Sequence, residues 1–207
     1  MQTDLETSAD PQESAVFVHA AAICESRQVG EGTRIWPFTH VMEGAVVGRD
    51  CNIGEHVFIE GGVRVGDRVT IKNQVMIWEG VTVEDDVFLG PGMIFTNDPY
   101  PRSRRTPAQN DRYGSRDRWL RRTLVRQGAS IGAGAIILCG NTIGRYGSVG
   151  AGAVVTSDVP SHRLAVGNPA RCVGWACICG MSLDDALRCW SCSRQYRMIG
   201  QTLLAVE

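Results

Sequence analysis

Four cysteines near the end of the chain have the spacing of a metal site. Cys177 and Cys179 form a C-x-C pair, and Cys189 and Cys192 form a C-x2-C pair after nine intervening residues. Four thiolates suit tetrahedral zinc and leave no position open for water, so the metal would be structural. The first pair is tighter than the usual C-x2-C, and two disulfides are the alternative. We expect a zinc-ribbon-like appendage at 176–197, because so short a segment needs a metal or covalent cross-link to fold.

Side chains that can accept a proton near neutral pH are few. The chain has four histidines, of which His40 and His56 are candidate general bases, although a lone histidine in a repeat is more often structural. Glu79, in the run W-E-G, is a candidate carboxylate base or a solvated corner residue. Lys72 and Asn73 could contact substrate hydroxyls or phosphate, and the alternative for both is a plain surface turn.

The residues that must position these groups repeat every six places. Thirteen consecutive sixth positions from Ile23 to Phe95 are apolar, and the series resumes from Val125 to Val155. A smaller or β-branched residue, such as Ala45, follows four places after each apolar position from Val41 to Val83. A period of six fits neither a helix nor a plain strand, but it fits short strands joined by tight turns, with three hexapeptides closing each coil. We therefore predict an all-β fold, a parallel β-helix with coils about 4.8 Å apart.

Residues three hexapeptides apart lie above one another in such a coil. One column therefore holds Glu25, Glu43, Gly61, Glu79 and Asn97. Asn97 lies where the repeat breaks, which is a plausible edge of a cleft. An asparagine amide can orient an amine but cannot take its proton, whereas the carboxylate one coil away can.

The break between Phe95 and Val125 contains three prolines and eight arginines, so it cannot continue the coil. We expect an extruded loop, because long insertions in a compact repeat are usually functional or disordered. Its arginines, Arg102 among them, would suit a lid over phosphates of a nucleotide or of CoA. The alternative is a solvated loop that pairs with a neighbouring subunit. If the loop is inserted between whole coils, Cys139 shares the Asn97 column.

Two stretches resemble a known family. Residues 56–98, with the runs K-N-x-V, E-D-D-V-F and F-T-N, resemble hexapeptide-repeat sugar 3-N-acetyltransferases, especially those acting on UDP-2-acetamido-3-amino-2,3-dideoxy-glucuronate or dTDP-linked 3-amino-6-deoxyhexoses. Residues 131–171 are similar to the acetyl-CoA half of hexapeptide acyltransferases. The resemblance covers roughly residues 15–175. It implies a left-handed coil, a homotrimer with active sites between subunits, and acetyl transfer from acetyl-CoA to the 3-amino group of a UDP- or dTDP-linked sugar for surface polysaccharide or glycoconjugate synthesis.

The resemblance also implies roles for individual residues. Asn97 matches the family's F-T-N asparagine, which contacts the sugar amine. Glu79 is assigned by its column instead: one coil from Asn97, it could bind the ammonium or accept its proton. His40 lies in W-P-F-T-H, a pattern shared with the family. His56 stands where the glucuronate group often has asparagine, a departure from that group's pattern. The released CoA sulfur is an alternative proton acceptor.

The second half of the repeat is expected to bind the acyl donor. Ala133 and Ala151 are one coil apart and match the family's stacked small residues, which let the pantetheine arm lie against the backbone. The alternative for these alanines is simple packing. Thr156, Gly167 and Arg171 match the adenosine and phosphate end.

Composition excludes several other classes. The net charge of -1 and the lack of a basic face outside the loop argue against nucleic-acid binding. No apolar run is long enough to span a membrane, and the acidic start has no signal-peptide pattern, so we expect a cytoplasmic protein. The remaining alternatives are an acyltransferase with another acceptor and a non-catalytic β-helix scaffold. A zinc carbonic anhydrase would need converging histidines, which the spacing does not offer.

These observations divide the chain into seven parts. The predicted order is an acidic tail at 1–14, β-helix at 15–95, the extruded loop at 96–124, the acetyl-CoA half of the β-helix at 125–160, a connecting arm at 161–175, the zinc-ribbon-like appendage at 176–197 and a tail at 198–207.

Overall fold

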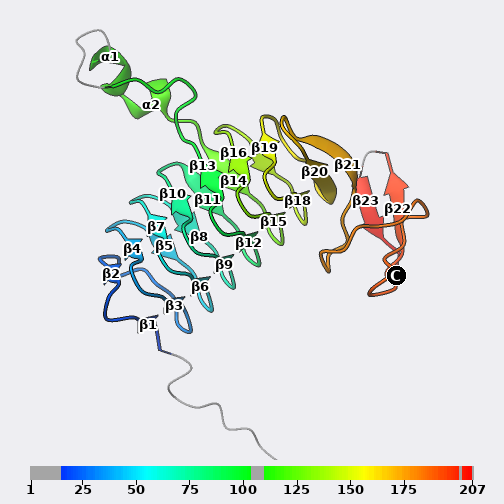
Figure 1. Cartoon of the computed structure of the whole chain (residues 1–207), viewed down its shortest axis with the longest axis horizontal. Helices are drawn as coiled ribbons and strands as arrows, with labels where there is room; N and C mark the ends of the chain where they lie inside the picture. The colour runs from blue at the N-terminus through cyan, green and yellow to red at the C-terminus, as the bar shows by residue number, and fades with distance from the viewer. Residues whose placement is uncertain (1–14, 104–109, 201, 207) are drawn as a thin grey trace, which may run out of the picture.

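The computed structural model describes residues 15–103, 110–200 and 202–206. A coil of short strands runs along the long axis of the molecule, the loop with α1 and α2 projects from its side, and the hairpin β22–β23 lies at the C-terminal end (Figure 1). The predicted acidic tail at 1–14, and Arg104 and Arg105 of the loop, lie outside the described residues.

The strands form three faces of a prism, and each strand in the coil pairs in parallel with the strand one coil away. The nine-stranded face is built from β1 Phe17–Val18, β3 Arg34–Ile35, β6 Asn52–Ile53, β9 Thr70–Ile71, β12 Phe88–Leu89, β15 Ser130–Ile131, β18 Ser148–Val149, β20 Arg163–Val166 and β21 Arg171–Trp175. The seven-stranded face is built from β2 Ile23–Cys24, β4 His40–Val41, β7 Phe58–Ile59, β10 Met76–Ile77, β13 Ile94–Phe95, β16 Ile136–Ile137 and β19 Val154–Val155. The five-stranded face is built from β5 Val46–Val47, β8 Arg64–Val65, β11 Val81–Val83, β14 Thr123–Val125 and β17 Thr142–Ile143.

Alternation within each two-residue strand explains the six-residue period. The first residue points outward and the second inward, so Ile59 and Ile77 are fully buried on the seven-stranded face. The smaller residue four places after each inward residue from Val41 to Val83 is buried too, as Cys51 and Val63 are. The predicted fold class, an all-β parallel solenoid, is confirmed.

The predicted inward series is wrong at its first member. Ile23 points outward and is 56% exposed, while Cys24 takes the inward place opposite Val41. The first coil is one residue short, because the step from Cys24 to Val29 has one residue fewer than the step from Val41 to Val47. From Val29 onward the coils have their regular length, and the predicted register holds.

The extruded loop leaves the coil after β13 and returns to it in phase. Phe95 pairs with Ile137, and both side chains point inward, so the inserted segment does not disturb the stacking. The described part of the loop contains two single-turn helices, α1 Asn110–Tyr113 and α2 Arg116–Trp119, which composition did not predict. As expected for a loop inserted between whole coils, Cys139 stacks next to Asn97, and its N–H donates to the Thr96 hydroxyl over 2.9 Å.

Some turn glycines are required because the next coil touches them. A Cβ added to Gly132 would lie 2.4 Å from the backbone nitrogen of Ala151. We expect Gly132→Ala to destabilise the fold by about 3 kcal/mol, since an extra methyl group forces the backbone apart. Gly174→Ala is the matched control, because a Cβ there meets no atom within 4 Å. Urea unfolding measures both, and equal stabilities for the two variants would contradict the stacking described here.

The C-terminal part closes the coil and carries the cysteines. β20 and β21 pair antiparallel and extend the nine-stranded face. The segment expected to be a tail contributes to a hairpin, in which β22 Tyr196–Ile199 pairs with β23 Thr202–Ala205. Within the described ranges, no helix is long and apolar enough to cross a membrane.

Candidate active site

The predicted polar column forms one edge of the prism, between the seven- and five-stranded faces. We call it the glutamate edge; its turns contain Glu43, Glu79, Asn97 and Cys139. The Asn97 amide nitrogen lies 3.4 Å from the Glu79 carbonyl oxygen, a long hydrogen bond. Asn97 therefore stacks directly beside Glu79, as the repeat predicts, and the Cys139 turn follows on the far side.

The Glu79 carboxylate is tied to the extruded loop. Its oxygen lies 2.8 Å from Nε of Arg116 in α2, and the Glu79 side chain is only 22% exposed, whereas Arg116 is 72% exposed. The Glu79 N–H donates to the Glu60 carboxylate over 2.7 Å, which fixes the turn. A cationic amine could take the place of the guanidinium, so this carboxylate can bind an ammonium group or accept a proton from it.

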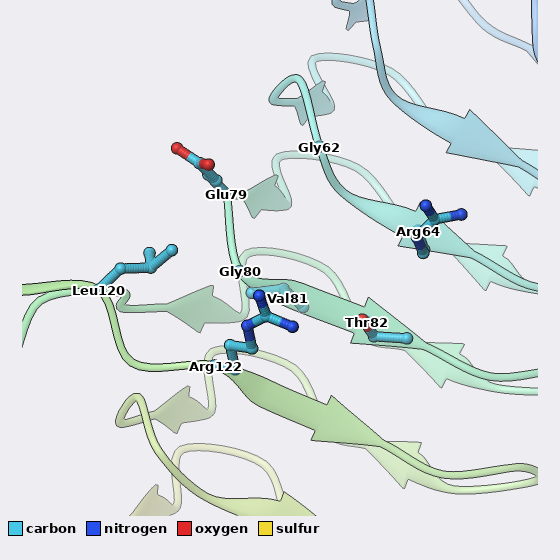
Figure 2. Close-up of a pocket in the computed structure, with 8 residues that line it drawn as sticks. All are labelled: Gly62, Arg64, Glu79, Gly80, Val81, Thr82, Leu120 and Arg122. Atoms are coloured by element: carbon cyan, nitrogen blue, oxygen red, sulfur yellow. The ribbon is translucent and has the colours of Figure 1, made fainter. Parts of the chain in front are cut away.

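A cleft of about 280 Å³ opens beside Glu79, on the outside of the five-stranded face. Figure 2 shows its lining, in which Leu120 and Arg122 from the end of the loop lie next to the turn at Gly80. Gly62 and Gly80 both have positive φ, and Leu120 packs directly against Gly80, since a Cβ there would come 3.0 Å from the Leu120 side chain. The remaining lining residues are Arg64, Val81 and Thr82.

Asp98 organises the base of the loop. Its carboxylate accepts hydrogen bonds from Arg112, from the Tyr113 hydroxyl over 2.9 Å and from the Tyr100 N–H over 2.8 Å. Burial of the Asp98 carboxyl raises its pKa, but the hydrogen bonds outweigh burial and hold the pKa below its ordinary value. The backbone N–H of Arg102 donates to the same Tyr113 hydroxyl over 2.8 Å. The outgoing segment of the loop and helix α1 therefore meet at the Asp98 carboxylate.

We expect Asp98→Asn to loosen the loop, because the variant keeps the size of the side chain but loses the charge that Arg112 neutralises. Hydrogen bonds to charged groups contribute about 1.5–3 kcal/mol, so cleavage of the loop by a protease at neutral pH would be about tenfold faster or more. Asp117→Asn, in α2 of the same loop, is the matched control. An unchanged cleavage rate in Asp98→Asn would rule out this role.

The sign of the pH dependence follows from the lowered pKa of Asp98. The contribution of Asp98 is fully present above the ordinary carboxyl pKa of about 3.9 and is lost as the pH falls through the lowered value. Protease resistance of the loop is therefore expected to persist throughout the neutral and mildly acidic range.

The predicted histidines lie away from Asn97 in this chain. His40 is on β4, three coils from β13, with Nε2 3.5 Å from a Glu25 carboxylate oxygen and without hydrogen-bond geometry to any described residue. At about 4.8 Å per coil, that is about 14 Å along the axis. His56 lies at a different edge and stacks on the ring of Phe38, with 4.9 Å between ring centroids. One chain thus brings together Glu79 and Asn97, but neither histidine.

The edge between the nine- and seven-stranded faces collects the other predicted residues. We call it the alanine edge; its turns contain His56, Asn73, Ala133 and Ala151. Asn73 accepts the Glu55 N–H over 3.2 Å, so its side chain helps to stack the coils. Lys72 is exposed beside it, and both line a hollow of about 280 Å³.

In the second half of the alanine edge, the backbone is exposed and small residues cover little of it. Ala133 and Ala151 stack in successive coils, with the Gly152 N–H donating to the Ala133 carbonyl over 2.9 Å. A Cβ built on Gly134 or Gly152 would meet no atom within 4 Å, so the surface there is open. An extended ligand with few side chains in its way can lie along such a ridge.

The end of the coil contains a larger hollow of about 460 Å³. Thr156 and Arg171 line it, together with the exposed Cys172. Gly167 lies in the turn between β20 and β21 with a φ of +93°. Arg102 is in the extruded loop instead, where its guanidinium donates to the Pro101 carbonyl over 2.9 Å.

The four predicted cysteines converge. Their sulfur atoms all lie within 4.8 Å of one another, with 3.5 Å from Cys177 to Cys192 and from Cys179 to Cys189. Four sulfurs around zinc at about 2.3 Å would be about 3.8 Å apart, so the cluster fits a tetrahedral ion. None of these cysteines forms a disulfide. Cys177 and Cys189 are buried, and hydrogen bonds from Arg194 lower the pKa of the Cys192 thiol to about 6, whereas burial and the neighbouring sulfurs raise the pKa of the Cys179 thiol to about 12.

Several residues of these sites were not found by sequence reasoning. The Tyr196 hydroxyl lies 3.1 Å from the Cys177 sulfur and accepts the Ile178 N–H, so it supports the cysteine cluster. Arg64 occupies an outward strand position next to Thr82, and reading this column in the way the glutamate column was read could have found it. Arg116 carries no such signal, because the loop has no repeat.

Comparisons with known proteins agree with this arrangement. The family model for bacterial transferase hexapeptide (six repeats) matches residues 28–61. The chain is 47% identical over 184 residues, 87% of its length and 90% of the relative's, to dTDP-3-amino-3,6-dideoxy-alpha-D-galactopyranose 3-N-acetyltransferase of Aneurinibacillus thermoaerophilus. A 54-residue part, 26% of this chain and 20% of the relative, is 50% identical to serine acetyltransferase of Escherichia coli K12.

A solved structure supports the same assignment. A hexapeptide-repeat acetyltransferase of Vibrio cholerae, complexed with acetyl coenzyme A, superposes with a TM-score of 0.52 at 27% identity, over 64% of this chain and 70% of that one. The 47% identity extends over most of both chains, and the repeat and the stacked polar edge agree with it. Together they show that this chain belongs to the hexapeptide-repeat sugar N-acetyltransferases, enzymes that use acetyl-CoA.

Proposed function

We propose that the protein transfers the acetyl group of acetyl-CoA to the 3-amino group of a dTDP-linked 3-amino-3,6-dideoxyhexose. This proposal depends chiefly on one observation: the chain is 47% identical, over 90% of the relative's length, to a protein named for that reaction. The adjacent Glu79 and Asn97 supply the two polar groups that an amine acceptor needs.

In the proposed reaction, the neutral amine attacks the thioester carbonyl carbon from about 3–3.5 Å. The Asn97 amide orients the amine, and Glu79 holds its ammonium form before reaction, in the place that Arg116 fills in this structure. The ammonium form first releases one proton to solvent. The carbon–nitrogen bond then forms, the carbon–sulfur bond breaks, and the second proton lost by nitrogen reaches the leaving CoA sulfur, directly or through Glu79. The product is an acetamido sugar and free CoA.

We propose that acetyl-CoA lies along the alanine edge, with its pantetheine arm against Ala133 and Ala151 and its adenosine end near Thr156, Gly167 and Arg171. The open backbone beside Gly134 and Gly152 supports this placement. Both co-substrates are small molecules of the cytoplasm, so we place the enzyme there.

A trimer would join the two edges. The alanine and glutamate edges lie at opposite margins of the seven-stranded face, so one chain cannot bring the donor and acceptor groups together. In a homotrimer, the alanine edge of one subunit would face the glutamate edge of its neighbour. Outward residues Met76, Ile94 and Leu138, each more than a third exposed, support association through this region. Light scattering would give three times the chain mass of 22.5 kDa, and a monomer would contradict the shared site.

We also propose that Cys177, Cys179, Cys189 and Cys192 hold one structural zinc ion through four thiolates. The sulfur separations and the lack of disulfides support this ligand set. Zinc would supply a cross-link there and take no part in acetyl transfer, because four protein ligands leave no open coordination position.

Incubation with acetyl-CoA and a panel of UDP- and dTDP-linked 3-amino sugars tests the proposed acceptor. Product masses, read at matched concentrations, are expected to show a gain of one acetyl group on dTDP-linked 3-amino-3,6-dideoxyhexoses, with higher kcat/KM than on UDP-linked sugars. Preferred transfer to a UDP-linked amino-glucuronate would replace the dTDP proposal. No transfer to any member, together with no binding of acetyl-CoA, would favour a scaffold.

A further inference from the structure

Two arginines line the cleft beside Glu79 without an acidic partner among the described residues. Arg64 extends outward from β8, and Arg122 immediately precedes β14. We infer that these two side chains bind the diphosphate of the nucleotide sugar and thereby place its amine at Glu79 and Asn97. This inference rests on the proposed function and names the part of the site that recognises the nucleotide carrier.

The charges around the cleft single out these two residues. Arg116 pairs with Glu79, Arg112 with Asp98, Arg68 with Asp86 and Arg126 with Glu84. Within the described ranges, neither Arg64 nor Arg122 forms an ion pair or a side-chain hydrogen bond. Two uncompensated guanidinium groups on one small cleft favour a dianionic ligand, and their planar forks match phosphate oxygens.

Both arginines project from fixed backbone. Arg64 lies on the strand next to Thr82, in register with it. The neighbours of Arg122 are anchored on both sides, since the Arg121 N–H donates to the Asn97 carbonyl over 2.9 Å and the Thr123 N–H to the Gly80 carbonyl over 3.1 Å. Figure 2 shows the Arg122 guanidinium beside Gly80 and Val81, with Arg64 on the adjacent strand. Both side chains line the same cleft.

The chemistry of the substrate requires this closeness. In a nucleotide-linked 3-amino hexose, the diphosphate is attached at C1 and the amine at C3, with a single ring carbon between them. Groups that bind the two ends must therefore line the same small space. A cleft of about 280 Å³ is below the usual size of a complete ligand site, about 300–1,000 Å³, so it would hold the sugar and diphosphate while the nucleoside lies outside.

Binding of dTDP without any sugar tests the arginines separately from catalysis. Calorimetric titration with dTDP compares the wild-type protein, Arg64→Gln and Arg122→Gln. Arg34→Gln is the matched control, because Arg34 is an exposed outward residue of the nine-stranded face. We expect each cleft variant to weaken dTDP binding about tenfold or more, in line with the loss of a charge-assisted hydrogen bond. Arg34→Gln would bind dTDP as the wild type does.

Kinetics give a second readout. The KM for the nucleotide sugar is expected to rise with the dissociation constant for dTDP in both cleft variants, while the KM for acetyl-CoA and the melting temperature stay unchanged. Arg64→Lys and Arg122→Lys keep the positive charge but lose the planar guanidinium group that can donate two parallel hydrogen bonds. They would therefore recover only part of the affinity for dTDP. A large fall in kcat with unchanged KM would point to another role and overturn the inference.

The results separate this inference from the proposed function. If the wild type acetylates dTDP sugars but both glutamine variants bind dTDP normally, the diphosphate site is wrong and the function stands. If dTDP binds and the variants weaken it, yet no dTDP sugar is acetylated, the anion site stands and the acceptor is wrong. If dTDP does not bind the wild-type protein, the inference is overturned.

Discussion

Replacing Asn97 by alanine is expected to lower kcat for amino-sugar acetylation by about a hundredfold or more, the usual cost of losing a positioned polar group at the reacting atoms. Asn97 lies beside Glu79 at the glutamate edge, where the loop leaves the coil. Its side-chain hydrogen bond, to a carbonyl 3.4 Å away, is long, so the loss of this contact would cost about 1 kcal/mol of stability or less. Catalysis and folding would therefore respond very differently to this substitution.

Asn141→Ala is the matched control for that experiment. Asn141 follows the Cys139 turn at the same edge, and its side-chain amide donates to the Leu138 carbonyl over 2.8 Å. Like Asn97 it bonds to a backbone carbonyl, but it does not lie next to Glu79. Steady-state rates with saturating acetyl-CoA and equal melting temperatures are the readouts. Comparable rates for Asn97→Ala and the wild type would remove Asn97 from the reaction.

Loss of zinc is expected to unfold the appendage while the coil stays folded. The appendage has a small core of its own, with Cys177, Cys189, Tyr196 and Leu203 buried. Structural zinc sites contribute on the order of 10 kcal/mol of folding free energy, far more than so few apolar side chains can supply. Metal analysis of purified protein is expected to find about one zinc per chain, and Cys189→Ser to abolish it.

Cys172→Ser is the control for the metal site, because Cys172 is exposed and does not belong to the four-cysteine cluster. Limited proteolysis followed by mass analysis would release the appendage from Cys189→Ser and from chelated wild type, but leave the Cys172→Ser protein intact. An appendage that resists proteolysis without metal would contradict the zinc assignment and favour disulfides.

The repeat was sufficient to predict the coil, because one physical rule recurs along it. Every sixth residue must be apolar when each two-residue strand points one side chain inward, so Ile59, Ile77 and Ile137 could be assigned to the core from their spacing alone. Ile23 failed because a single missing residue in the first coil turned it outward. The stacking of residues one coil apart likewise predicted that Asn97 would lie next to Glu79.

The loop contacts could not be predicted in the same way. The pairs Arg116–Glu79 and Arg112–Asp98 join a segment without periodicity to fixed points on the coil. Eight arginines in the loop gave many possible partners, and only the backbone path through α1 and α2 selects among them. The two edges also could not be combined from sequence, since the register places residues on an edge but does not say which edges meet between subunits.

Nitrogen acetylation at C3 of the sugar is the central claim, and determination of the product structure tests it most directly. The protein would be incubated with acetyl-CoA and dTDP-3-amino-3,6-dideoxygalactose, and the purified product examined by NMR spectroscopy. We expect one acetyl group bonded to the nitrogen at C3, with one CoA released per sugar. An acetyl group on a hydroxyl oxygen, or recovery of unmodified sugar while acetyl-CoA binds, would contradict the account.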